Sequence, residues 1–548
     1  MNASDTVYDV IGLGFGPANL AIAGAILDKY SAPASSGAAA ASCAKNVLFI
    51  EKHPVFKWHP GMLLPDTRMQ ISYLKDLATL RSPQSPLTFL SYLHSQGRLL
   101  PFINRGASTP SRREYSDYLS WAAQYVQDRG INVQYGEEVI GIKEADDDTV
   151  EVTSRRIEGG ETFTRRARNL IVSPGGQAKF PTAISIALPH PRILHSSVYA
   201  YSIDNILPSV LNRPDQERPI RIAIIGSGQS SSEVLLDLHR RLSGAGHRDC
   251  ELDLIFRKGS LKPSDDSPFA NEIFDPDTTD MVYNLPSQRV RREVLNEYHN
   301  TNYGVVNPRT IDALYELMYD QKLDDAVSRR HGQTINGVRV SMQPYTDILS
   351  ADDASTAHPG DHAEPSSTDR ASPAVRLTLQ NVLDKSIREK TYDIVVCGTG
   401  YERNSWIRLL SSSDIGKYFG LHSSSSPVEL VPAAAKPIED GNVSPVSDTY
   451  KPKVDWGFPS TQSSGTSTPL TSPSLSNSHI LHNTKVYITR NYRLLPLEAG
   501  NEKTFKPKVY LQGCTESTHG LSESLLSILG VRSGLVVNDL FGDEAVAQ

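Results

Sequence analysis

Two glycine-rich runs have the residue types that bind the pyrophosphate of a dinucleotide. The first is GLGFGP at residues 12–17, and the second is GSGQSS at residues 226–231. Glycines let the backbone N–H groups of a turn approach a phosphate closely, and a helix that begins in the turn adds the positive end of its dipole. Each run therefore predicts a dinucleotide site, with a tight turn that binds no ligand as the alternative.

Both runs depart from the GxGxxG pattern at its third glycine, where Pro17 and Ser231 stand. That position mainly determines how closely the helix packs on the strand, so phosphate binding can survive the change. Both turns therefore remain predicted phosphate sites.

Each turn is followed by an apolar run that ends in a charged residue. Residues 46–50 lead to Glu51, whose carboxylate suits a ribose hydroxyl, although an Ala/Ser-rich insertion places it beyond the usual ~20 residues. Residues 251–256 lead to Arg257, followed by Lys258. A cation there suits a 2′-phosphate and predicts NADPH rather than NADH, with an ordinary solvated charge as the alternative.

The elements around the turns indicate how these residues are positioned. Strands are predicted at residues 7–11 and 220–225, with helices at 18–30 and from the second turn to about Leu242. Such alternation is typical of an α/β fold with two Rossmann-like dinucleotide-binding domains. A further strand at 392–396, followed by CGTGY, is expected to return the chain to the first sheet.

Four stretches have the composition of mobile loops inserted between ordered elements. A phosphorylated regulatory segment at their Ser-Pro and Thr-Pro sites is the alternative. The stretches are residues 31–44, 351–373, 411–427 and 457–478.

Composition excludes several classes of protein. The 548 residues carry 55 basic and 62 acidic side chains, with no basic block that would follow a nucleic-acid backbone. The four cysteines form no CxxC pair, which argues against a disulfide framework, a zinc site and a dithiol reductase. No apolar run approaches the ~20 residues of a membrane helix, and the polar N-terminus is no signal peptide. We therefore expect a cytoplasmic protein without metal, membrane or nucleic-acid partners.

Four runs resemble the fungal L-ornithine N(5)-monooxygenases. The resemblance extends from residue 7 to about residue 540, and two of the runs are long and are not general nucleotide-binding motifs. The runs are GLGFGPANL at 12–20, MQISYLKDL at 69–77, DDSPFANEIF at 265–274 and THGLS at 518–522.

This resemblance implies a class B flavin monooxygenase that hydroxylates the side-chain nitrogen of L-ornithine, the first step of hydroxamate siderophore biosynthesis. NADPH would reduce FAD, dioxygen would give a flavin C(4a)-hydroperoxide, and the neutral amine would attack its distal oxygen. Because the cofactor carries the chemistry, we expect no Ser, Cys or His nucleophile. The family also suggests a homotetramer.

The resemblance and the turns together predict the domains. An FAD-binding domain would span residues 1–214 and 385–548, and an NADPH-binding domain with the substrate-binding segment would span 215–345. Residues 346–384 would be a flexible insertion with a strand that returns to the FAD domain.

The residue roles follow from matching positions. Those assigned to FAD are Gly12, Gly14, Gly16, Glu51, Lys52, His53, Trp58, His59, Gln70, Val139, Ser524, Leu525 and Leu526. Those assigned to NADP(H) are Ser227, Gly228, Gln229, Ser230 and Arg257. Those assigned to ornithine are Lys75, Asn271, Glu272, Ile273, Phe274, Asn302 and Ser527. The positions assigned to catalysis are Met69 and Arg112 near the isoalloxazine, and Asn302 between substrate and nicotinamide.

Several of these residues have structural alternatives. Lys75 would compensate the substrate carboxylate, which is costly to desolvate alone, but it could be a surface lysine. Arg112 lies in the sequence SRRE, a capping box for a helix to about residue 128. The pair at 265–266 could cap a loop or accept an α-ammonium, and His519 could be a satisfied loop histidine or a proton carrier.

Three other functions compete with ornithine hydroxylation. An L-lysine N(6)-hydroxylase differs by one methylene, worth only ~1–3 kcal/mol. Baeyer–Villiger and flavin-containing monooxygenases carry F-x-G-x-x-x-H-x-x-x-W, whereas residues 193–199 read ILHSSVY, without the Phe, Gly or Trp. A non-catalytic FAD/NADPH-binding sensor is the alternative from another class, and ornithine-dependent hydroxamate formation separates it from an enzyme.

Overall fold

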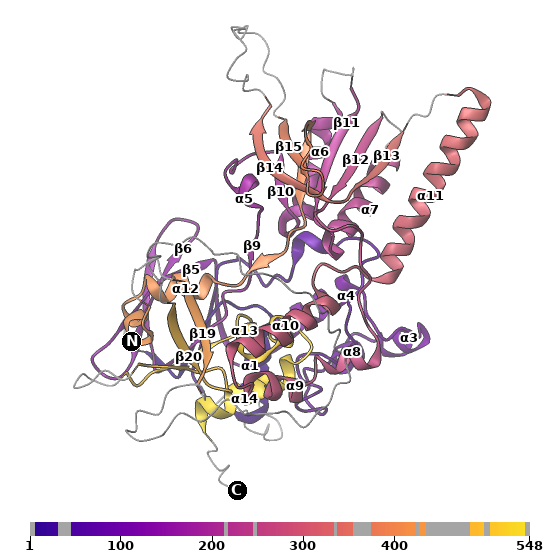
Figure 1. Cartoon of the computed structure of the whole chain (residues 1–548). Coiled ribbons are helices and arrows are strands. Elements are labelled where there is room, and N and C mark those ends of the chain that lie inside the picture. The colour runs from indigo at the N-terminus through magenta and orange to yellow at the C-terminus, as the bar shows by residue number, and fades with distance from the viewer. Residues whose placement is uncertain are drawn as a thin grey trace, which may run out of the picture.

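The computed structural model describes nine stretches of the chain. The described residues form two parts, each built on a parallel sheet (Figure 1). The stretches are residues 6–30, 45–212, 218–244, 249–333, 337–354, 374–421, 427–433, 483–497 and 505–542.

The first sheet combines strands from the two ends of the chain. Its order is β22-β8-β2-β3-β4, and all its pairs are parallel. Four of the strands, β2, β3, β8 and β22, are almost wholly buried because both faces of the sheet are covered, whereas the edge strand β4 is partly exposed. Their bounds are β2 (Val10–Leu13), β3 (Val47–Glu51), β4 (Asn132–Tyr135), β8 (Asn169–Val172) and β22 (Lys508–Leu511).

Helices from both ends of the chain form the core beside the first sheet. α1 (Pro17–Tyr30) packs against α4 (Arg112–Gln127) and α14 (Leu529–Phe541). Residues of β2, β3 and the short α2 (Phe89–Ser95) complete this core. The helix predicted at residues 18–30 is therefore confirmed.

Smaller sheets cover the other side of the first sheet. One has the order β1-β7-β6-β5, and another has the order β19-β20-β21. They share a core with β8 and with α12 (Ser405–Ser411). Their bounds are β1 (Val7–Tyr8), β5 (Glu137–Glu144), β6 (Val150–Arg156), β7 (Thr162–Ala167), β19 (Val428–Pro432), β20 (Thr484–Ile488) and β21 (Leu494–Leu495).

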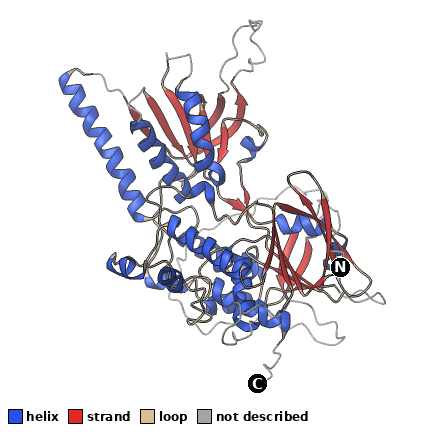
Figure 2. Cartoon of the chain, turned by 180° about the vertical axis from the view of Figure 1, so that it is seen from behind, coloured by secondary structure: helices blue, strands red, loops and turns tan. Residues whose placement is uncertain are grey.

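The second sheet is also parallel, with the order β10-β17-β11-β12-β13. Three helices pack on one of its faces, and the longest of them lies at the outer edge of this part (Figure 2). The strands are β10 (Ile193–His195), β11 (Ile220–Ile225), β12 (Cys250–Ile255), β13 (Val338–Gln343) and β17 (Ile394–Cys397). The helices are α6 (Tyr199–Leu211), α7 (Gln229–Gly244) and α11 (Pro308–His331).

The other face of the second sheet is covered by three antiparallel strands. These are β14 (Thr346–Asp353), β15 (Val375–Asn381) and β16 (Ile387–Tyr392). The short helix α5 (Thr182–Ser185) packs in the same core. The second part is therefore a sheet with helices on one face and a small antiparallel sheet on the other.

Our expectation for the strand at residues 392–396 is wrong. This strand, β17, pairs with β10 and β11 in the second sheet, and the chain returns to the first sheet only at β22. The physical reason is the strand register, in which apolar residues 394–396 align with residues 222–224 of β11. The turn after β17 also fits here, because a Cβ on Gly398 would fall 2.8 Å from the Ser231 side chain.

The segment 264–306 leaves the second sheet and packs on the first part, where α9 and α10 contact α13 (Figure 1). Its helices are α8 (Pro268–Glu272), α9 (Pro276–Tyr283) and α10 (Gln288–Asn302), and they lie near α13 (Glu516–His519) and the 3-10 helix η5 (Leu521–Ser524). The remaining short elements are η1 (Pro60–Met62), α3 (Leu99–Asn104), β9 (Gln177–Ala178), η2 (Ser196–Val198), β18 (Tyr401–Glu402) and η3 (Asp414–Phe419).

The predicted loops have different outcomes. For residues 411–421 of the third loop, the prediction of a mobile segment is wrong. The helix α12 ends there, and Ile415 and Phe419 of η3 are buried. Residues 351–353 of the second loop belong to β14. The loops at 31–44 and 457–478 lie outside the described residues. Over the described stretches, no helix has both the length and the apolar character needed to span a bilayer.

Candidate functional site

The three glycines of the first turn have different surroundings. A Cβ on Gly12 would fall 2.2 Å from the Phe49 ring, and Gly14 has φ +85° with a backbone oxygen 2.5 Å from where its Cβ would be. Gly16, in contrast, has no atom of the described residues within 4 Å of its Cβ position. Gly12 and Gly14 therefore pack tightly against the protein, whereas the space beside Gly16 is open. This open space fits the close approach of a phosphate.

The carboxylate of Glu51 is fixed at this turn. Its Oε2 accepts the backbone N–H of Phe15 over 2.8 Å, and its Oε1 accepts that of His53 over 2.9 Å. Asn19, which sequence reasoning missed, is fully buried and donates from Nδ2 to the Gly14 carbonyl over 2.7 Å. An acidic residue beside the start of α1 fits the recognition of a ribose hydroxyl.

The second turn packs against two other segments. Gly226 has φ +125°, and a Cβ there would fall 2.6 Å from the Gly398 carbonyl oxygen. A Cβ on Gly228 would lie 3.7 Å from the Cα of Gly304. The turn thus brings the start of α7 close to the end of α10, where Asn302 lies.

The Gln229 side chain joins α7 to the start of α11. Its Oε1 accepts the backbone N–H of Asn307 over 2.7 Å, and its Nε2 donates to Thr310 Oγ1 over 3.1 Å and to Glu233 Oε1 over 2.7 Å. Arg257 follows β12 and is exposed, and Lys258 Nζ donates to the Gly304 carbonyl over 3.3 Å. Arg257 is therefore accessible to a phosphate.

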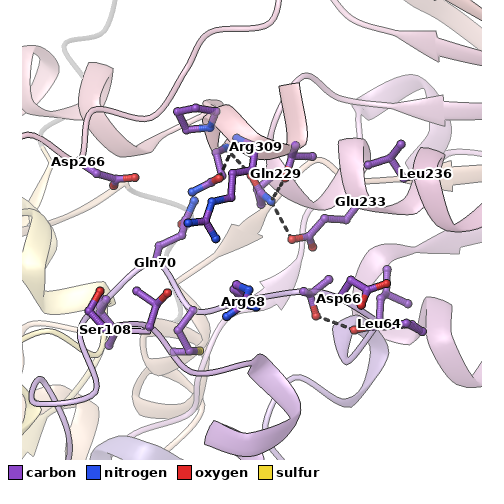
Figure 3. Close-up of a pocket in the computed structure, with 18 of the residues that line it drawn as sticks. Leu64, Asp66, Arg68, Gln70, Ser108, Gln229, Glu233, Leu236, Asp266 and Arg309 are labelled. Atoms are coloured by element: carbon purple, nitrogen blue, oxygen red, sulfur yellow. Dashed lines mark hydrogen bonds between the residues drawn. The ribbon is translucent and has the colours of Figure 1, made fainter. Parts of the chain in front are cut away.

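A cavity of about 890 Å³ lies between the two parts of the molecule (Figure 3). Its walls come from the loop after η1, from α7, from the start of α11 and from the segment before α8. Sites for small molecules are often found between domains, and this volume is within their usual range. The predicted site residues in its lining are Met69, Gln70, Lys75, Gln229 and Asn271.

Charged side chains of both signs line the cavity. The cations are Lys75, Arg68, Arg240 and Arg309, and the carboxylates include Asp266. In Figure 3, Arg309 lies beside Gln70 and Gln229. Such a wall can compensate both ends of a free amino acid, whose carboxylate and ammonium would otherwise lose their solvation.

Asp265 and Asp266, the acidic pair at the start of the third family run, have different surroundings. Asp265 accepts the backbone N–H of Ser267, the residue that caps α8, over 3.0 Å. Asp266 accepts the Ser264 hydroxyl over 3.2 Å and lines the cavity. Asn271 Nδ2 donates to the Asp266 carbonyl over 3.0 Å, which orders this wall.

Several predicted residues lie outside the lining of this cavity. Ser527 is buried, and its hydroxyl has no hydrogen-bond partner among the described residues. Asn302 is half-buried at the end of α10, whereas Glu272 is exposed. The other positions outside the lining are the first turn, residues 51–53, 58–59, 112, 139, 227–228, 230, 257, 273–274 and 524–526.

Arg112 connects the first part of the molecule to the second. It is the first residue of α4, whose cap Ser111 accepts the N–H of Glu114 over 3.1 Å, as the capping pattern predicts. Its Nη1 donates to Glu233 Oε2 of α7 over 2.6 Å. The guanidinium therefore has a role in structure, in addition to the role predicted near the flavin.

Two histidines are held in the neutral form. The His59 side chain is exposed, yet desolvation by nearby protein atoms, followed by the charges of Arg112 and Arg403, lowers its pKa to about 4. Burial, followed by the charge of Arg490, lowers the pKa of His519 to about 3. His519 Nε2 faces the Thr489 carbonyl at 3.1 Å, so this histidine is a satisfied structural residue rather than a proton carrier.

Sequence reasoning missed several residues that line the cavity or contact a predicted site residue. Glu233 lies four residues after Gln229 on α7, which is the only local signal for it. Arg309 follows an Asn-Pro pair that begins a helix. Tyr303 donates to Glu516 Oε2 over 2.6 Å and lies 3.2 Å from the Ser524 hydroxyl, and no local pattern predicts these long-range contacts.

Within the described stretches, no group of three or more His, Cys, Asp or Glu side chains is placed to hold a metal ion. Among the described residues, Cys250, Cys397 and Cys514 form no disulfide bond. The described site thus consists of two glycine-rich turns and a cavity that Gln229 of the second turn helps to line.

Comparison with known proteins supports a specific family. The model of the L-lysine 6-monooxygenase/L-ornithine 5-monooxygenase family matches residues 6–403. The L-ornithine N(5)-monooxygenase of Ceriporiopsis subvermispora is 58% identical over 99% of both chains, and that of Coprinopsis cinerea is 46% identical over 98% of both chains.

Solved structures show the same similarity. The ornithine hydroxylase from Pseudomonas aeruginosa has a TM-score of 0.68 at 29% identity, covering 98% of this chain and 99% of that chain. The ornithine N-hydroxylase of Kutzneria sp. 744, solved with reduced FAD, NADP⁺ and L-ornithine, has a TM-score of 0.68 at 27% identity with the same coverage.

Proposed function

Because the chain belongs to the L-lysine 6-monooxygenase/L-ornithine 5-monooxygenase family, we propose that it hydroxylates N5 of L-ornithine for siderophore biosynthesis. The reaction consumes NADPH and dioxygen, uses FAD, and releases NADP⁺ and water. One observation carries the proposal: Met69, Gln70 and Lys75 share a cavity with Asn271 and with Gln229 of the second dinucleotide turn. A substrate there would lie between the two dinucleotide-binding parts.

The residues of the two turns fit the two cofactors. At the first turn, the open position of Gly16 and the fixed Glu51 carboxylate support the assignment to FAD. At the second, the start of α7 and the exposed Arg257 support the assignment to NADPH, whose 2′-phosphate needs a cation. When bound, FAD reduced by NADPH would activate dioxygen, whose one oxygen atom the amine would receive while the other leaves as water.

The chain's own residues bind and orient the substrate. In our proposal Lys75 pairs with the ornithine carboxylate, Asp266 accepts its α-ammonium, and Asn271 orders the wall between them. The side-chain amine must be neutral to react, because an ammonium has no lone pair. A site that limits water disfavours the charged amine and favours this state.

The remaining assigned positions surround this arrangement. Arg112 and Met69 are proposed to lie by the isoalloxazine, and Asn302 between the substrate and the nicotinamide. The hydroxyl of Ser527 is buried and has no hydrogen-bond partner in the described part of the chain, which supports a ligand contact there, since such groups in native proteins usually have a partner. The assembly is proposed to be a homotetramer, which the family resemblance supports. A cytoplasmic location is proposed as well, because the described cysteines form no disulfide bond.

L-Lysine is the alternative substrate, because the family model covers both activities. One extra methylene is worth only ~1–3 kcal/mol, so the cavity volume does not decide between them. The names of the 58% and 46% identical relatives favour ornithine.

Optical spectra of the purified protein with FAD test the proposal. Under anaerobic conditions NADPH should bleach the flavin absorbance, and air should restore it. A hydroxylamine product should form with ornithine and to a much smaller extent with lysine, 1,4-diaminobutane or other amino acids. Flavin reduction without any hydroxylated product from this panel would contradict the proposed function.

A further inference from the structure

Glu233 occupies the boundary between the two parts of the molecule. It lies in the first turns of α7, and only 7% of its surface is exposed. Its Oε2 accepts from Arg112 Nη1 over 2.6 Å, and its Oε1 accepts from Gln229 Nε2 over 2.7 Å. One carboxylate therefore binds a different partner with each oxygen (Figure 3 shows the contact with Gln229).

The two partners belong to different helices, and Gln229 connects to a third. Arg112 begins α4, whose apolar face packs in the core of the first part. Gln229 begins α7, and its amide binds Asn307 and Thr310 at the start of α11. Through Glu233, the starts of all three helices are held together.

Burial makes this connection rigid. A buried carboxylate is costly unless it is paired and hydrogen-bonded, and breaking a buried ion pair leaves an uncompensated charge. With both oxygens occupied, the Glu233 side chain has little freedom to change its rotamer without losing a partner. The position of Arg112 relative to Gln229 is thus determined by a single side chain.

We propose that Glu233 is a positioning residue that keeps the NADP(H)-binding turn in register with the flavin-binding part. This inference rests on the proposed function, in which Gln229 belongs to the nucleotide site and Arg112 lies by the flavin. Glu233 acts through these two residues. Reacting groups must be held about 3–3.5 Å apart, and small misplacements cost about a hundredfold in rate, so this register matters for every transfer between nicotinamide and flavin.

Two variants and a matched control test the proposal. Glu233→Gln keeps the size and an acceptor for Gln229 but removes the charge that holds Arg112. Glu233→Asp keeps the charge but is one methylene too short to reach both partners. In the control Glu251→Gln, the lost carboxylate pairs with Arg221 and Lys390 inside the second part alone.

The first measurement is NADP⁺ affinity, titrated on the FAD-loaded protein without turnover. We expect Glu233→Gln to weaken it about tenfold and Glu233→Asp by less, with Glu251→Gln close to the unmodified chain. The second measurement is the coupling of NADPH oxidation to hydroxylation, which is the electron division between the two products. In the Glu233 variants, a larger share of the NADPH consumed should give hydrogen peroxide, and a smaller share should give hydroxylated ornithine. FAD content should stay unchanged in all three variants.

Unchanged NADP⁺ affinity and unchanged electron division in both Glu233 variants would overturn the proposal, even if their melting temperatures fell. A loss as large in Glu251→Gln would overturn it as well, since it would make the effect one of general stability. If Glu233→Gln does not fold, Glu233→Asp decides the same two measurements. A failure of the proposed function is distinguishable, because it would abolish ornithine hydroxylation in the unmodified chain and leave the NADP⁺ titration intact.

Discussion

The Glu51 carboxylate accepts the backbone N–H of Phe15 over 2.8 Å, so the end of β3 is bonded to the first glycine-rich turn. Glu51→Ala should remove this bond and the acceptor for a ribose hydroxyl. Hydrogen bonds to charged groups are worth about 1.5–3 kcal/mol, so we expect FAD affinity to fall about tenfold or more. The loss of bound FAD is measured as the ratio of flavin to protein absorbance after purification. Glu138→Ala, at an exposed position in β5, should keep its flavin; equal losses in both variants would contradict the role of Glu51.

Arg257→Ala should raise the KM for NADPH about tenfold or more and leave that for NADH nearly unchanged, because only NADPH carries the 2′-phosphate. Initial rates of flavin reduction with each nucleotide measure the two constants. Arg329→Ala, an exposed position at the end of α11, serves as the control. Equal losses for the two nucleotides would show that Arg257 does not bind the phosphate.

Lys75→Ala should raise the KM for ornithine strongly, since it removes the cation proposed for the substrate carboxylate. FAD content and NADPH-dependent flavin reduction should remain close to normal, because neither depends on that carboxylate. Product assays over a range of ornithine concentrations, with Lys322→Ala on α11 as the control, measure the change. If FAD is lost together with ornithine binding, Lys75 is a structural residue.

Hydroxylation should rise with pH, because a free alkylamine with a pKa near 10.4 is neutral in only about one molecule in 2,500 at pH 7. Desolvation in the cavity and the charge of Lys75 should both lower the amine's pKa below its value in water. Flavin reduction should depend much less on pH. Single-turnover product formation across a pH series tests this, and a flat profile from neutrality upward would exclude a neutral-amine mechanism for the observed step.

His519 should make the folded chain less stable in acid. Its pKa is lowered from 6.5 to about 3, so between these values the unfolded chain binds more protons than the folded one. The contribution of His519 to the free energy of unfolding is fully present above pH 6.5. It is lost as the pH falls below that value, by about 1.4 kcal/mol per pH unit. Urea unfolding at pH 7 and 5.5 measures it. His519→Gln should reduce this difference and His331→Gln should not; equal pH dependence in all three proteins would contradict the assignment.

Local patterns predicted the elements that carry the two turns. The strand at residues 220–225 and the helix starting after the second turn are present as β11 and α7, because apolar periodicity and glycine turns act over a few residues. The same reasoning placed β17 in the wrong sheet, since a short apolar strand contains no information about its partner. Serine-rich composition likewise concealed the buried Ile415 of η3.

The site was only partly accessible to sequence reasoning. The family runs named Lys75 and Asn271, which are almost 200 residues apart in the chain and which the fold brings to one cavity. The ion pair of Arg112 with Glu233 joins residues 121 positions apart, and neither local periodicity nor a motif indicates it. Contacts of this kind depend on how the two parts pack.

The position of β22 has a consequence for biosynthesis. Every strand of the second sheet precedes residue 398, but β8 of the first sheet must wait for a partner that begins at Lys508. Translating the more than 300 residues between them takes on the order of half a minute, during which β8 is an unprotected sheet edge. We therefore expect the second part to fold first on the ribosome, and a nascent chain that stalls before residue 508 to be prone to aggregation and unable to retain flavin.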